Sequence, residues 1–459
     1  MKIKIYLFTI LLIIAISLLS SFSFSQTFSA GLNHSLTICS DNSLMAFGGT
    51  NNGELGNGND ANSFVPVSVS FLTDVNAVAA GGQHSLALKN DGTVWAWGRN
   101  DYGQLGNGNN ANSNLPVQVS SLTGIIAIAT GNYHSIALKN NGTVWVWGWN
   151  LNGQLGNGNN SNSNIPVQLI SLSGITAISG GHDHTIALKN NGTVWAWGRN
   201  DFGQLGIGNN TNTNTPTQVS ILTGITAISA GGGNLLALKS DGTVWACGEN
   251  STGQVGNGNY TNTNVPIQVS SLSNIIAIAG GWTFSLALKN DGTLWAFGDN
   301  SAGQLGNGNN TNTNTPLQVS SPSGIIAISA GGSHSLALKD DGTLWTWGWN
   351  GYGQMAYSDG NGSNLPLQVM ALCTVTNAIH KIDEQSFVSV FPNPANDKIT
   401  IETTHKSKIE LLNIHGQVLR TIFSDEISTQ IDVSNLSSGI YLIKTKSENG
   451  VSIMKFIKQ

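Results

Sequence analysis

The stretch 84–108, HSLALKNDGTVWAWGRNDYGQLGNG, decides the fold because the chain repeats it almost unchanged. It returns fifty residues later as HSIALKNNGTVWVWGWNLNGQLGNG (134–158) and again as HTIALKNNGTVWAWGRNDFGQLGIG (184–208). Two residue types mark seven such copies at a constant spacing of 50 residues: Gly31, Gly81, Gly131, Gly181, Gly231, Gly281 and Gly331, and then Pro66, Pro116, Pro166, Pro216, Pro266, Pro316 and Pro366. A fixed period of this length indicates one supersecondary unit repeated along the chain.

Each copy predicts four short strands. Those of the third copy are 125–129 (IIAIA), 135–139 (SIALK), 143–148 (TVWVWG) and, after a long polar loop, 167–169 (VQL). Asn140-Asn141-Gly142 is a tight-turn signal, because Asn and Gly accept the positive φ that a hairpin requires. The period of two along a strand places Trp145 and Trp147 on the same face.

Four antiparallel strands in each of seven units predict an all-β protein with a seven-bladed β-propeller of 50-residue repeats. One sheet cannot bury both of its faces alone, whereas radial stacking against two neighbours buries them, with the tryptophan pairs supplying much of the area. An open solenoid would need atypical capping repeats at its ends. The first and last copies keep the common pattern, so a closed ring is favoured.

The composition agrees with short strands and turns. Only 9% of the 459 residues are charged, against roughly 25% in an ordinary soluble protein, and the chain holds 56 glycines and 13 tryptophans. Glycine destabilises a helix by about 1 kcal/mol per position, so this mixture disfavours helices.

Residues 1–25 are predicted to be a secretory signal peptide, cleaved before Gln26. A short basic start precedes an apolar run over 6–19, and Ser23-Phe24-Ser25 supplies the small residues that a signal peptidase requires. An uncleaved membrane anchor is the alternative. No other segment approaches the ~20 apolar residues that span a bilayer, so we expect no transmembrane span in the mature chain.

Three cysteines occur without metal-binding spacing. Cys247 replaces a Trp or Phe of the other copies and is predicted to be a buried filler. Cys39 and Cys373 lie near the two ends of the repeated region, where ring closure would bring them together in an oxidising compartment. A disulfide between them is one hypothesis, and two unpaired thiols are the other.

The repeat resembles that of the regulator of chromosome condensation family, whose members form seven-bladed propellers. The resemblance covers about residues 27–372, within a predicted propeller domain of 26–373, and is weakest in the first copy, which has SDNSLMAFGG where the second has KNDGTVWAWG. The family's known activity, nucleotide exchange on a nuclear GTPase at chromatin, does not fit an exported chain. The ring also carries 8 Lys/Arg and 15 Asp/Glu, a net charge of −7, so we expect no nucleic-acid partner.

The tail differs in composition from the ring. Residues 374–386 are predicted to be a linker, and 387–459 a small β-sandwich-like domain. Pro392-Asn393-Pro394-Ala395, NIHG (413–416), SGIY (438–441) and KFIK (455–458) resemble the C-terminal sorting domain of the type IX secretion system. The resemblance implies that the type IX machinery is a partner, and that the protein is secreted or displayed on the outer-membrane surface of a Gram-negative bacterium. An ordinary carbohydrate-binding or structural β-domain is the alternative.

No motif of catalysis or cofactor binding is recognised. There is no GxSxG or HExxH and no paired-carboxylate pattern, and no helix follows the GNGNN segments. The Asn/Thr loops, such as 308–316, hold almost no carboxylate for calcium. Five copies carry a histidine at one repeat position: His34, His84, His134, His184 and His334. A ring of imidazoles could bind a metal, but Asn234 and Phe284 occupy this position in two copies. We therefore predict a structural hydrogen-bonding role for the five histidines. We therefore expect no catalytic, cofactor-binding or metal-binding residues.

Comparison of the seven copies separates two faces of the ring. Connections of a meander alternate between its ends, so the KNDG-type turns and SSLTG-type links share one face, the constant face. The short loops before the histidine position and the long loops after the tryptophan strand share the other, the variable face. Large or charged side chains vary there between copies, and they form the predicted binding surface: Arg99, Tyr102, Tyr133, Trp149, His182, Asp183, Arg199, Phe202, Trp282, Trp349 and Tyr352.

Exposed aromatic side chains flanked by charges are typical of binding surfaces for proteins or sugar rings. We therefore predict a monomeric, non-enzymatic propeller that binds an extracellular protein or polysaccharide through the variable face. Random drift between copies is the alternative explanation of the variation. Two other functions stay open: a polysaccharide-acting enzyme, which would need a group such as His182 beside Asp183 in a deep mouth, and a passive matrix component.

Overall fold

The computed structural model describes residues 27–320, 322–370, 372, 389–391, 395–402, 407–413, 418–424, 428–437, 439–447 and 450–458. The chain divides into two compact units, the first ending at Ala378 and the second beginning at Ile379. The predicted signal peptide (1–25) and linker (374–386) lie outside the described residues and stay predictions. In the described ranges no helix is long and apolar enough to cross a membrane.

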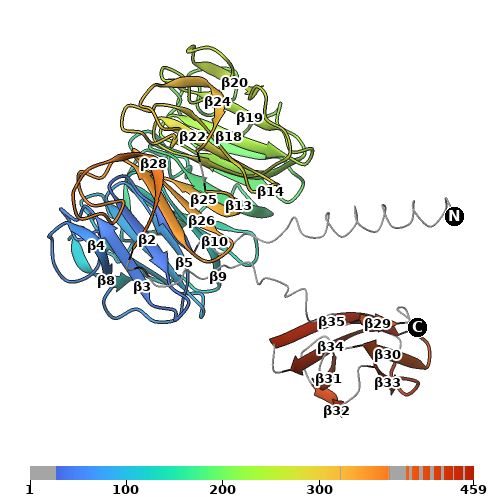
Figure 1. The fold of residues 1–459 in the computed structure, drawn as a ribbon. Coiled ribbons are helices and arrows are strands. Elements are labelled where there is room, and N and C mark those ends of the chain that lie inside the picture. The colour runs from blue at the N-terminus through green and yellow to red at the C-terminus, as the bar shows by residue number, and fades with distance from the viewer. Residues whose placement is uncertain are drawn as a thin grey trace. The chain divides into compact units, whose positions relative to one another are not determined.

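The first unit consists of seven antiparallel four-stranded sheets, or blades, each built from consecutive strands. The all-β seven-bladed propeller is therefore confirmed. In Figure 1 the colour runs from blue in blade 1 (β1–β4) to orange in blade 7 (β25–β28), and these two blades lie side by side, as the contacts of β1 with β25 and β26 require.

The strands occupy the same four positions in every blade. The innermost strands are β1 (Phe28–Ala30), β5 (Val75–Ala80), β9 (Ile125–Thr130), β13 (Ile175–Gly180), β17 (Ile225–Ala230), β21 (Ile275–Gly280) and β25 (Ile325–Ala330). The second strands are β2 (His34–Ile38), β6 (His84–Lys89), β10 (His134–Lys139), β14 (His184–Lys189), β18 (Asn234–Lys239), β22 (Phe284–Lys289) and β26 (His334–Lys339). The third strands are β3 (Leu44–Gly48), β7 (Val94–Gly98), β11 (Val144–Gly148), β15 (Val194–Gly198), β19 (Val244–Gly248), β23 (Leu294–Gly298) and β27 (Leu344–Gly348). The outermost are β4 (Ser63–Ser68), β8 (Ser113–Gln118), β12 (Ser163–Gln168), β16 (Thr213–Gln218), β20 (Thr263–Gln268), β24 (Thr313–Gln318) and β28 (Ser363–Gln368).

The fourth strand differs most from its prediction, since β12 begins at Ser163 rather than near residue 167. Its first residues are polar and half-buried or exposed, so they carry no apolar signal, yet Ser163 pairs with Gly148 across a bulge in the register. An outermost strand also tolerates Pro166, because one of its edges has no neighbour to bond.

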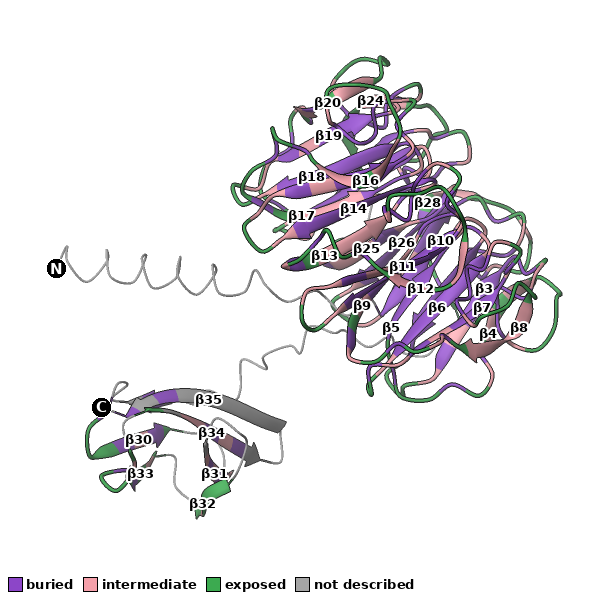
Figure 2. Cartoon of the chain, turned by 180° about the vertical axis from the view of Figure 1, so that it is seen from behind, coloured by how far each residue is buried: buried purple, intermediate pink, exposed green. Residues whose placement is uncertain are grey.

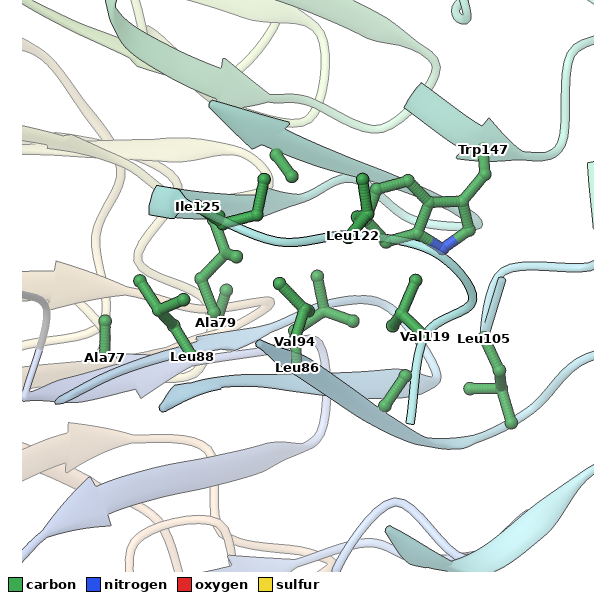
Figure 3. Packing of buried hydrophobic residues seen from close by; sticks show 13 residues of the cluster. Ala77, Ala79, Leu86, Leu88, Val94, Leu105, Val119, Leu122, Ile125 and Trp147 are labelled. Atoms are coloured by element: carbon green, nitrogen blue, oxygen red, sulfur yellow. The ribbon is translucent and has the colours of Figure 1, made fainter. Parts of the chain in front are cut away.

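Tryptophans fill the space between blades, as predicted. Trp147 is completely buried and Trp145 partly buried, and both pack on the core of the preceding blade. Figure 3 shows the Trp147 indole pointing from its own blade toward Leu122 of blade 2. Its Nε1–H donates to the carbonyl oxygen of Gln104, 2.9 Å away in a loop of blade 2, so the same ring packs and hydrogen-bonds across the seam.

The histidines at the repeated position form hydrogen bonds between neighbouring blades. In four pairs, Nε2 of the histidine lies 2.9 Å from a serine or threonine hydroxyl of the next blade: His34–Ser85, His84–Ser135, His134–Thr185 and His334–Ser35. Each hydroxyl donates onward to a loop carbonyl, of Glu54, Gln104, Gln154 and Gln354 respectively, and must therefore accept from the imidazole. The predicted structural role is confirmed for these four histidines.

The ring closes without exchanging a strand. Across the seam between blades 7 and 1, the N–H of Gly332 donates to the carbonyl of Gly31 (3.0 Å), and the N–H of Ala30 donates to Oγ of Ser329 (3.0 Å). A shared apolar cluster also spans this seam: Phe28, Ala30, Phe47, Leu336, Leu338, Leu344, Ala356 and Val369. The predicted disulfide of Cys39 involves Cys373, which lies outside the described residues, so the pairing stays a prediction.

The second unit is a small β-sandwich. One sheet has the order β29-β30-β33 and the other β32-β31-β34-β35, and apolar residues of both form a single core. Its strands are β29 (Ser389–Phe391), β30 (Lys398–Glu402), β31 (Ser407–Asn413), β32 (Val418–Ser424), β33 (Ser428–Asp432), β34 (Gly439–Ser447) and β35 (Gly450–Lys458). The predicted sandwich-like fold is confirmed.

The buried histidines predict a specific pH dependence of stability. Burial lowers the pKa of His34 and His184 to about 4, and that of His84, His134 and His334 to about 3. In the unfolded chain these groups titrate near 6.5, so unfolding takes up protons between pH 6.5 and 4. The free energy of unfolding should therefore decrease as the pH is lowered from 6.5 to 4, by up to about 1.4 kcal/mol per pH unit for each histidine.

Urea unfolding of the mature protein at several pH values between 4 and 7 measures this slope. The variant His134→Asn is a matched control, because blade 5 already uses Asn234 at the same position, where it donates to Ser285. It should lower the histidine contribution to the slope by about one fifth. An unchanged slope in this variant would show that the buried histidines do not cause the dependence.

The seam between blades 4 and 5 is predicted to open first. Leu235 stands where the other blades have the serine or threonine whose hydroxyl faces the histidine of the preceding blade, here His184. Cys247 stands at the position of the second tryptophan, and its Sγ lies 4.0 Å from the carbonyl oxygen of Gln204. Cys247 is free and completely buried, and burial raises its thiol pKa, so labelling requires the seam to open. We expect native-state labelling of this thiol before global unfolding.

A thiol moved to another seam is the control. The double variant Cys247→Trp/Trp147→Cys places it between blades 2 and 3, where the His84–Ser135 hydrogen bond remains. Since one hydrogen bond is worth about 1 kcal/mol, labelling of the moved thiol should be roughly five- to tenfold slower. Peptide mapping by mass spectrometry identifies the labelled residue, and equal rates at the two seams would contradict the prediction.

Candidate functional site

The two predicted faces of the ring are confirmed by backbone hydrogen bonds. On the variable face the N–H of Arg99 donates to the carbonyl of Gln83 (2.8 Å), which joins the long loop to the short loop of the same blade. On the constant face the N–H of Asn90 donates to the carbonyl of Asp74 (2.9 Å). Figure 2 shows exposed residues concentrated in such connections, while the strands between them are largely buried.

A buried asparagine fixes each long loop from within. Oδ1 of Asn100 accepts from the N–H of Leu105 (2.9 Å), and its Nδ2 donates to the carbonyls of Asn109 and Ala111 (both 3.0 Å). The loops of the next four blades repeat this arrangement around Asn150, Asn200, Asn250 and Asn300. The constant residues therefore hold the loop backbone, and the residues between them can change without altering it.

Four predicted residues form one aromatic cluster across blades 2 and 3. The ring centroids of Tyr102, Tyr133 and Trp149 lie 5.5–5.7 Å apart, with Tyr102 stacked on Trp149 and the other two pairs edge-on. The Arg99 guanidinium lies 5.1 Å from the Tyr133 ring and 5.5 Å from the Tyr102 ring. Its Nε donates to Asp101 (2.6 Å), which fixes the guanidinium over the rings.

The axial mouth is a cavity of about 90 Å³ around the ring axis, lined by residues 30–32 and their equivalents at 50-residue intervals in all seven blades. Backbone hydrogen bonds of 3.0–3.3 Å encircle it from blade to blade, with the N–H groups of Leu32, Gly82, Asn132, His182, Gly232, Trp282 and Gly332 as donors. Since most of its lining is glycine or alanine, the few larger side chains there determine its chemistry.

Three of these side chains, together with Asp183, form an axial cluster. Nδ2 of Asn132 lies 3.1 Å from Nε2 of His182, and the rings of His182 and Trp282 meet edge-on with centroids 4.7 Å apart. Because an amide NH₂ group only donates, Nε2 of His182 accepts this hydrogen bond, and Nδ1 carries a proton. Nδ1 is 2.9 Å from Oδ2 of Asp183, but the N–H is poorly aligned, so this contact is mainly electrostatic.

The remaining predicted residues lie beside or apart from these clusters. Arg199 places a guanidinium nitrogen 3.7 Å from Oδ2 of the buried Asp183, and it covers the Phe202 ring at 5.3 Å. Trp349 is 41% exposed and meets Tyr352 edge-on at 5.3 Å. In the described part of the chain, no ring contact joins this pair to either cluster.

Asn132 and several exposed side chains of the ring were not among the predicted residues. Asn132 belongs to the axial cluster and could have been found, because glycine occupies three of the equivalent positions. Leu151, on the long loop of blade 3, is 65% exposed. Exposed apolar side chains also occur on links of the constant face, which therefore varies more than expected: Phe71, Ile170, Ile221 and Met370.

The chemistry of the variable face suits binding. The axial cluster offers an amide, an imidazole, a carboxylate and an indole, and the aromatic cluster offers three rings and a guanidinium. No group of three or more His, Cys, Asp or Glu residues in the described ranges could hold a metal ion.

Family comparisons identify both units. Residues 163–385 match the RCC1-like domain, and residues 41–88 and 91–138 match the regulator of chromosome condensation (RCC1) repeat, as do 75–104 and 125–154 by a second description of that repeat. Residues 389–459 match the secretion system C-terminal sorting domain, which indicates a secreted or cell-surface protein. No curated protein matches the chain.

Solved structures share the propeller. Yeast RCC1 (Prp20), in a complex with Kap60, has a TM-score of 0.64 at 21% identity, covering 80% of this chain and 87% of the other. Prp20p of Saccharomyces cerevisiae gives 0.65 at 23%, covering 78% and 88%, and human WBSCR16 gives 0.62 at 25%, covering 67% and 84%. At such identities the likeness to Prp20 shows the fold alone.

The seven blades, the matched repeats and the matched tail lead to one assignment: the chain is an RCC1-repeat β-propeller that carries a type IX secretion system C-terminal sorting domain.

Proposed function

We propose that the mature protein is a non-catalytic recognition propeller, which binds an extracellular protein or polysaccharide through the variable face and acts as a monomer. The observation that carries this proposal is the aromatic cluster of Arg99, Tyr102, Tyr133 and Trp149. Its rings come from loops of two blades and hold one another in place. Tyr, Trp and Arg dominate binding hot spots, and rings fixed before binding lose little entropy on binding.

The distribution of charge supports an extracellular partner other than nucleic acid. The six lysines of the ring all end second strands beside turns of the constant face: Lys89, Lys139, Lys189, Lys239, Lys289 and Lys339. Arg99 and Arg199 are the remaining basic residues of the ring, and each is within 2.6 Å of a neighbouring aspartate. The variable face therefore lacks the basic footprint that a phosphate backbone requires. Gsp1p and histones are named as binding partners of Prp20p, and because the likeness to Prp20p shows the fold alone, neither is proposed as a partner of this chain.

A polysaccharide-acting enzyme is the second candidate, favoured by the contact between His182 and Asp183 at the axial mouth. Glycoside hydrolysis normally needs two carboxyl groups on opposite sides of the bond. Asp183 is instead placed between His182 and Arg199, and Nε2 of His182 is occupied by Asn132. Loss of polysaccharide depolymerisation in His182→Ala, with binding retained, would favour the enzyme over the recognition protein.

The variable face can be tested by removing its tryptophans. We expect Trp149→Ala/Trp282→Ala/Trp349→Ala to weaken binding at least tenfold, because each substitution removes a large ring from the predicted surface. The mature protein and the variant are screened by biolayer interferometry against immobilised polysaccharides and purified surface proteins. Thermal unfolding checks that the variant remains folded.

The matched control carries three substitutions on the opposite face, Phe71→Ala/Ile170→Ala/Ile221→Ala. Each removes an exposed apolar side chain, so the loss of apolar surface is comparable. Binding should be unchanged in this control. Equal binding by all three proteins would place the site elsewhere, and the absence of any ligand would favour a passive matrix component.

A further inference from the structure

A small polar cavity, the Glu54 cavity, lies on the variable face where blade 1 meets blades 7 and 2. Its volume is about 20 Å³, which is room for about one water molecule or one ammonium group. Its lining includes Asn33, Gly49 and Glu54 of blade 1, Gln83 of blade 2 and Tyr352 of blade 7. None of the axial-cluster side chains lines it, so it is a separate site.

Two residues that occur only in blade 1 meet at this cavity. Glu54 stands where each of the other six blades has glutamine. Gly49 stands where the other six blades have a large or charged side chain, namely Arg99, Trp149, Arg199, Glu249, Asp299 and Trp349. Blade 1 therefore has a carboxylate in place of an amide and lacks the side chain that would cover it.

Blade 6 shows that these two repeat positions are neighbours in space. Nε2 of Gln304, at the position of Glu54, donates to Oδ2 of Asp299, at the position of Gly49 (2.8 Å). In blade 6 the amide and the carboxylate are thus matched within the chain. In blade 1 the carboxylate is present without a side chain of its own blade to match it.

Blade 2 shows that a cation fits this place in a blade. Arg99 stands at the position of Gly49, and its Nη1 donates to Oε1 of Gln83 in the short loop of the same blade (2.6 Å). Blade 1 has Asn33 at the position of Gln83. A cation that enters the Glu54 cavity from outside would therefore find an amide and a carboxylate beside it.

Glu54 is a buried anion without a cation. Its side chain is 4% exposed, and its two oxygens accept from the backbone N–H and from Nδ2 of Asn52, at 2.8 and 3.0 Å. Among the described residues, no ion pair joins it to a basic side chain. Burial raises the pKa of Glu54, and the negative charge of Asp60 raises it further. A cation brought to this carboxylate would compensate its desolvation.

An aromatic pair borders the cavity. Tyr352 lines it, and the Tyr352 ring meets Trp349 edge-on with centroids 5.3 Å apart. Trp349 is 41% exposed, so its ring is open to a partner. Aromatic rings attract cations, and they also pack against the aliphatic stem of a long basic side chain. A carboxylate in a cavity of ammonium size, beside two rings, favours lysine.

The negative charge of the ring is concentrated on the variable face. Eight of its 15 carboxylates and both arginines lie there, a net charge of −6, whereas seven carboxylates and six lysines give −1 on the constant face. Three of the eight, Asp101, Asp183 and Asp201, lie within 4 Å of an arginine. The other five belong to the adjoining blades 5, 6, 7 and 1: Glu249, Asp299, Asp359, Glu54 and Asp60. This half of the face therefore attracts a basic partner.

We infer that the Glu54 cavity binds a lysine side chain of a protein partner, with the ammonium group at Glu54 and Asn33 and the aliphatic stem against Tyr352 and Trp349. This inference rests on the proposed function and deepens it, because it assigns the partner to one class, a protein with an exposed lysine. The aromatic cluster of blades 2 and 3 is free to contact other parts of that partner.

The test uses substitutions that the repeat itself supplies. Glu54→Gln introduces the residue of the other six blades, and Gly49→Arg introduces the residue of blades 2 and 4. A Cβ at Gly49 would lie 3.3 Å from Cβ of Asn33 and 3.4 Å from Cβ of Tyr352, so a side chain needs only a small shift of its neighbours. Thermal unfolding checks that both variants remain folded.

The mature protein is titrated with the peptide acetyl-Gly-Lys-Gly-amide by isothermal titration calorimetry, at about 0.15 M salt. Wild-type protein should bind it at millimolar concentration or below. Glu54→Gln and Gly49→Arg should each weaken binding tenfold or more, because one removes the anion and the other fills its surroundings with a cation of the chain. The norleucine analogue of the peptide, which keeps the stem and lacks the charge, should not bind.

Asp60→Asn is the matched control, since it removes a negative charge from an exposed position of the same loop. It should change peptide binding by no more than about twofold, because an exposed charge is screened by salt. Absence of lysine-peptide binding by the wild-type protein, or equal weakening in Asp60→Asn and Glu54→Gln, overturns the inference. Calcium chloride is titrated in parallel, and calcium binding through Glu54 without peptide binding also overturns it.

The two proposals fail in different ways. If the wild-type protein binds a partner that Trp149→Ala weakens and Glu54→Gln leaves unaffected, the recognition face stands and the lysine site falls. If the lysine peptide binds through Glu54 but no partner depends on the tryptophans of the variable face, the lysine site stands and the proposed function falls. If no partner and no peptide binds, both proposals fall.

Discussion

The architecture depends on one hydrogen-bonded clamp between neighbouring blades. The Ser85 hydroxyl of blade 2 sits between two groups of blade 1: it accepts from the His34 imidazole and donates to the Glu54 carbonyl. The same carbonyl also accepts from the indole of Trp97. Three motifs that are far apart within a repeat are therefore constant because they meet at one point: the His-Ser pair, the second tryptophan and the GQLG segment of the long loop, which is GELG (53–56) in blade 1.

The clamp also explains which residues can vary. Its groups are buried, so an unmatched change leaves a polar atom without a partner, at a cost of about 1–3 kcal/mol. Variable-face residues extend from loops whose backbone is already held by a buried asparagine such as Asn100. Substitution there changes the surface but not the frame. A rigid ring can thus present different side chains at seven equivalent places, and rigidity lowers the entropic cost of binding.

The strength of the repeat made most of the fold predictable. The spacing of the repeats predicted the period and the number of blades. It also predicted that Trp145 and Trp147 lie on the same side of their strand, and that the loops divide between a constant and a variable face. The beginning of the outermost strand did not, because residues such as Ser163 pair through the backbone and are polar. The structural role of the histidines was predicted, but the partner of His34 was not, since Ser85 becomes a neighbour only once the ring is formed.

The candidate site was less predictable for the same geometric reason. Tyr102, Tyr133 and Trp149 come from adjacent blades, and their proximity could be anticipated from the shared face. His182 and Trp282 belong to blades that are not adjacent, and they meet because inner loops converge on the axis and Gly232 is small. Pairwise contacts across the axis depend on ring size and loop direction, which a linear pattern does not contain.

The clamp is incomplete at blade 5, over which the axial cluster reaches from blade 4 to blade 6. Blade 5 lacks the hydroxyl at Leu235 and the indole at Cys247, and its next seam has a longer bond of 3.4 Å from Asn234 to Ser285. The edge-on contact of His182 with Trp282 joins blade 4 to blade 6 over this blade. This contact therefore bridges the seams on both sides of blade 5, where the clamp is incomplete.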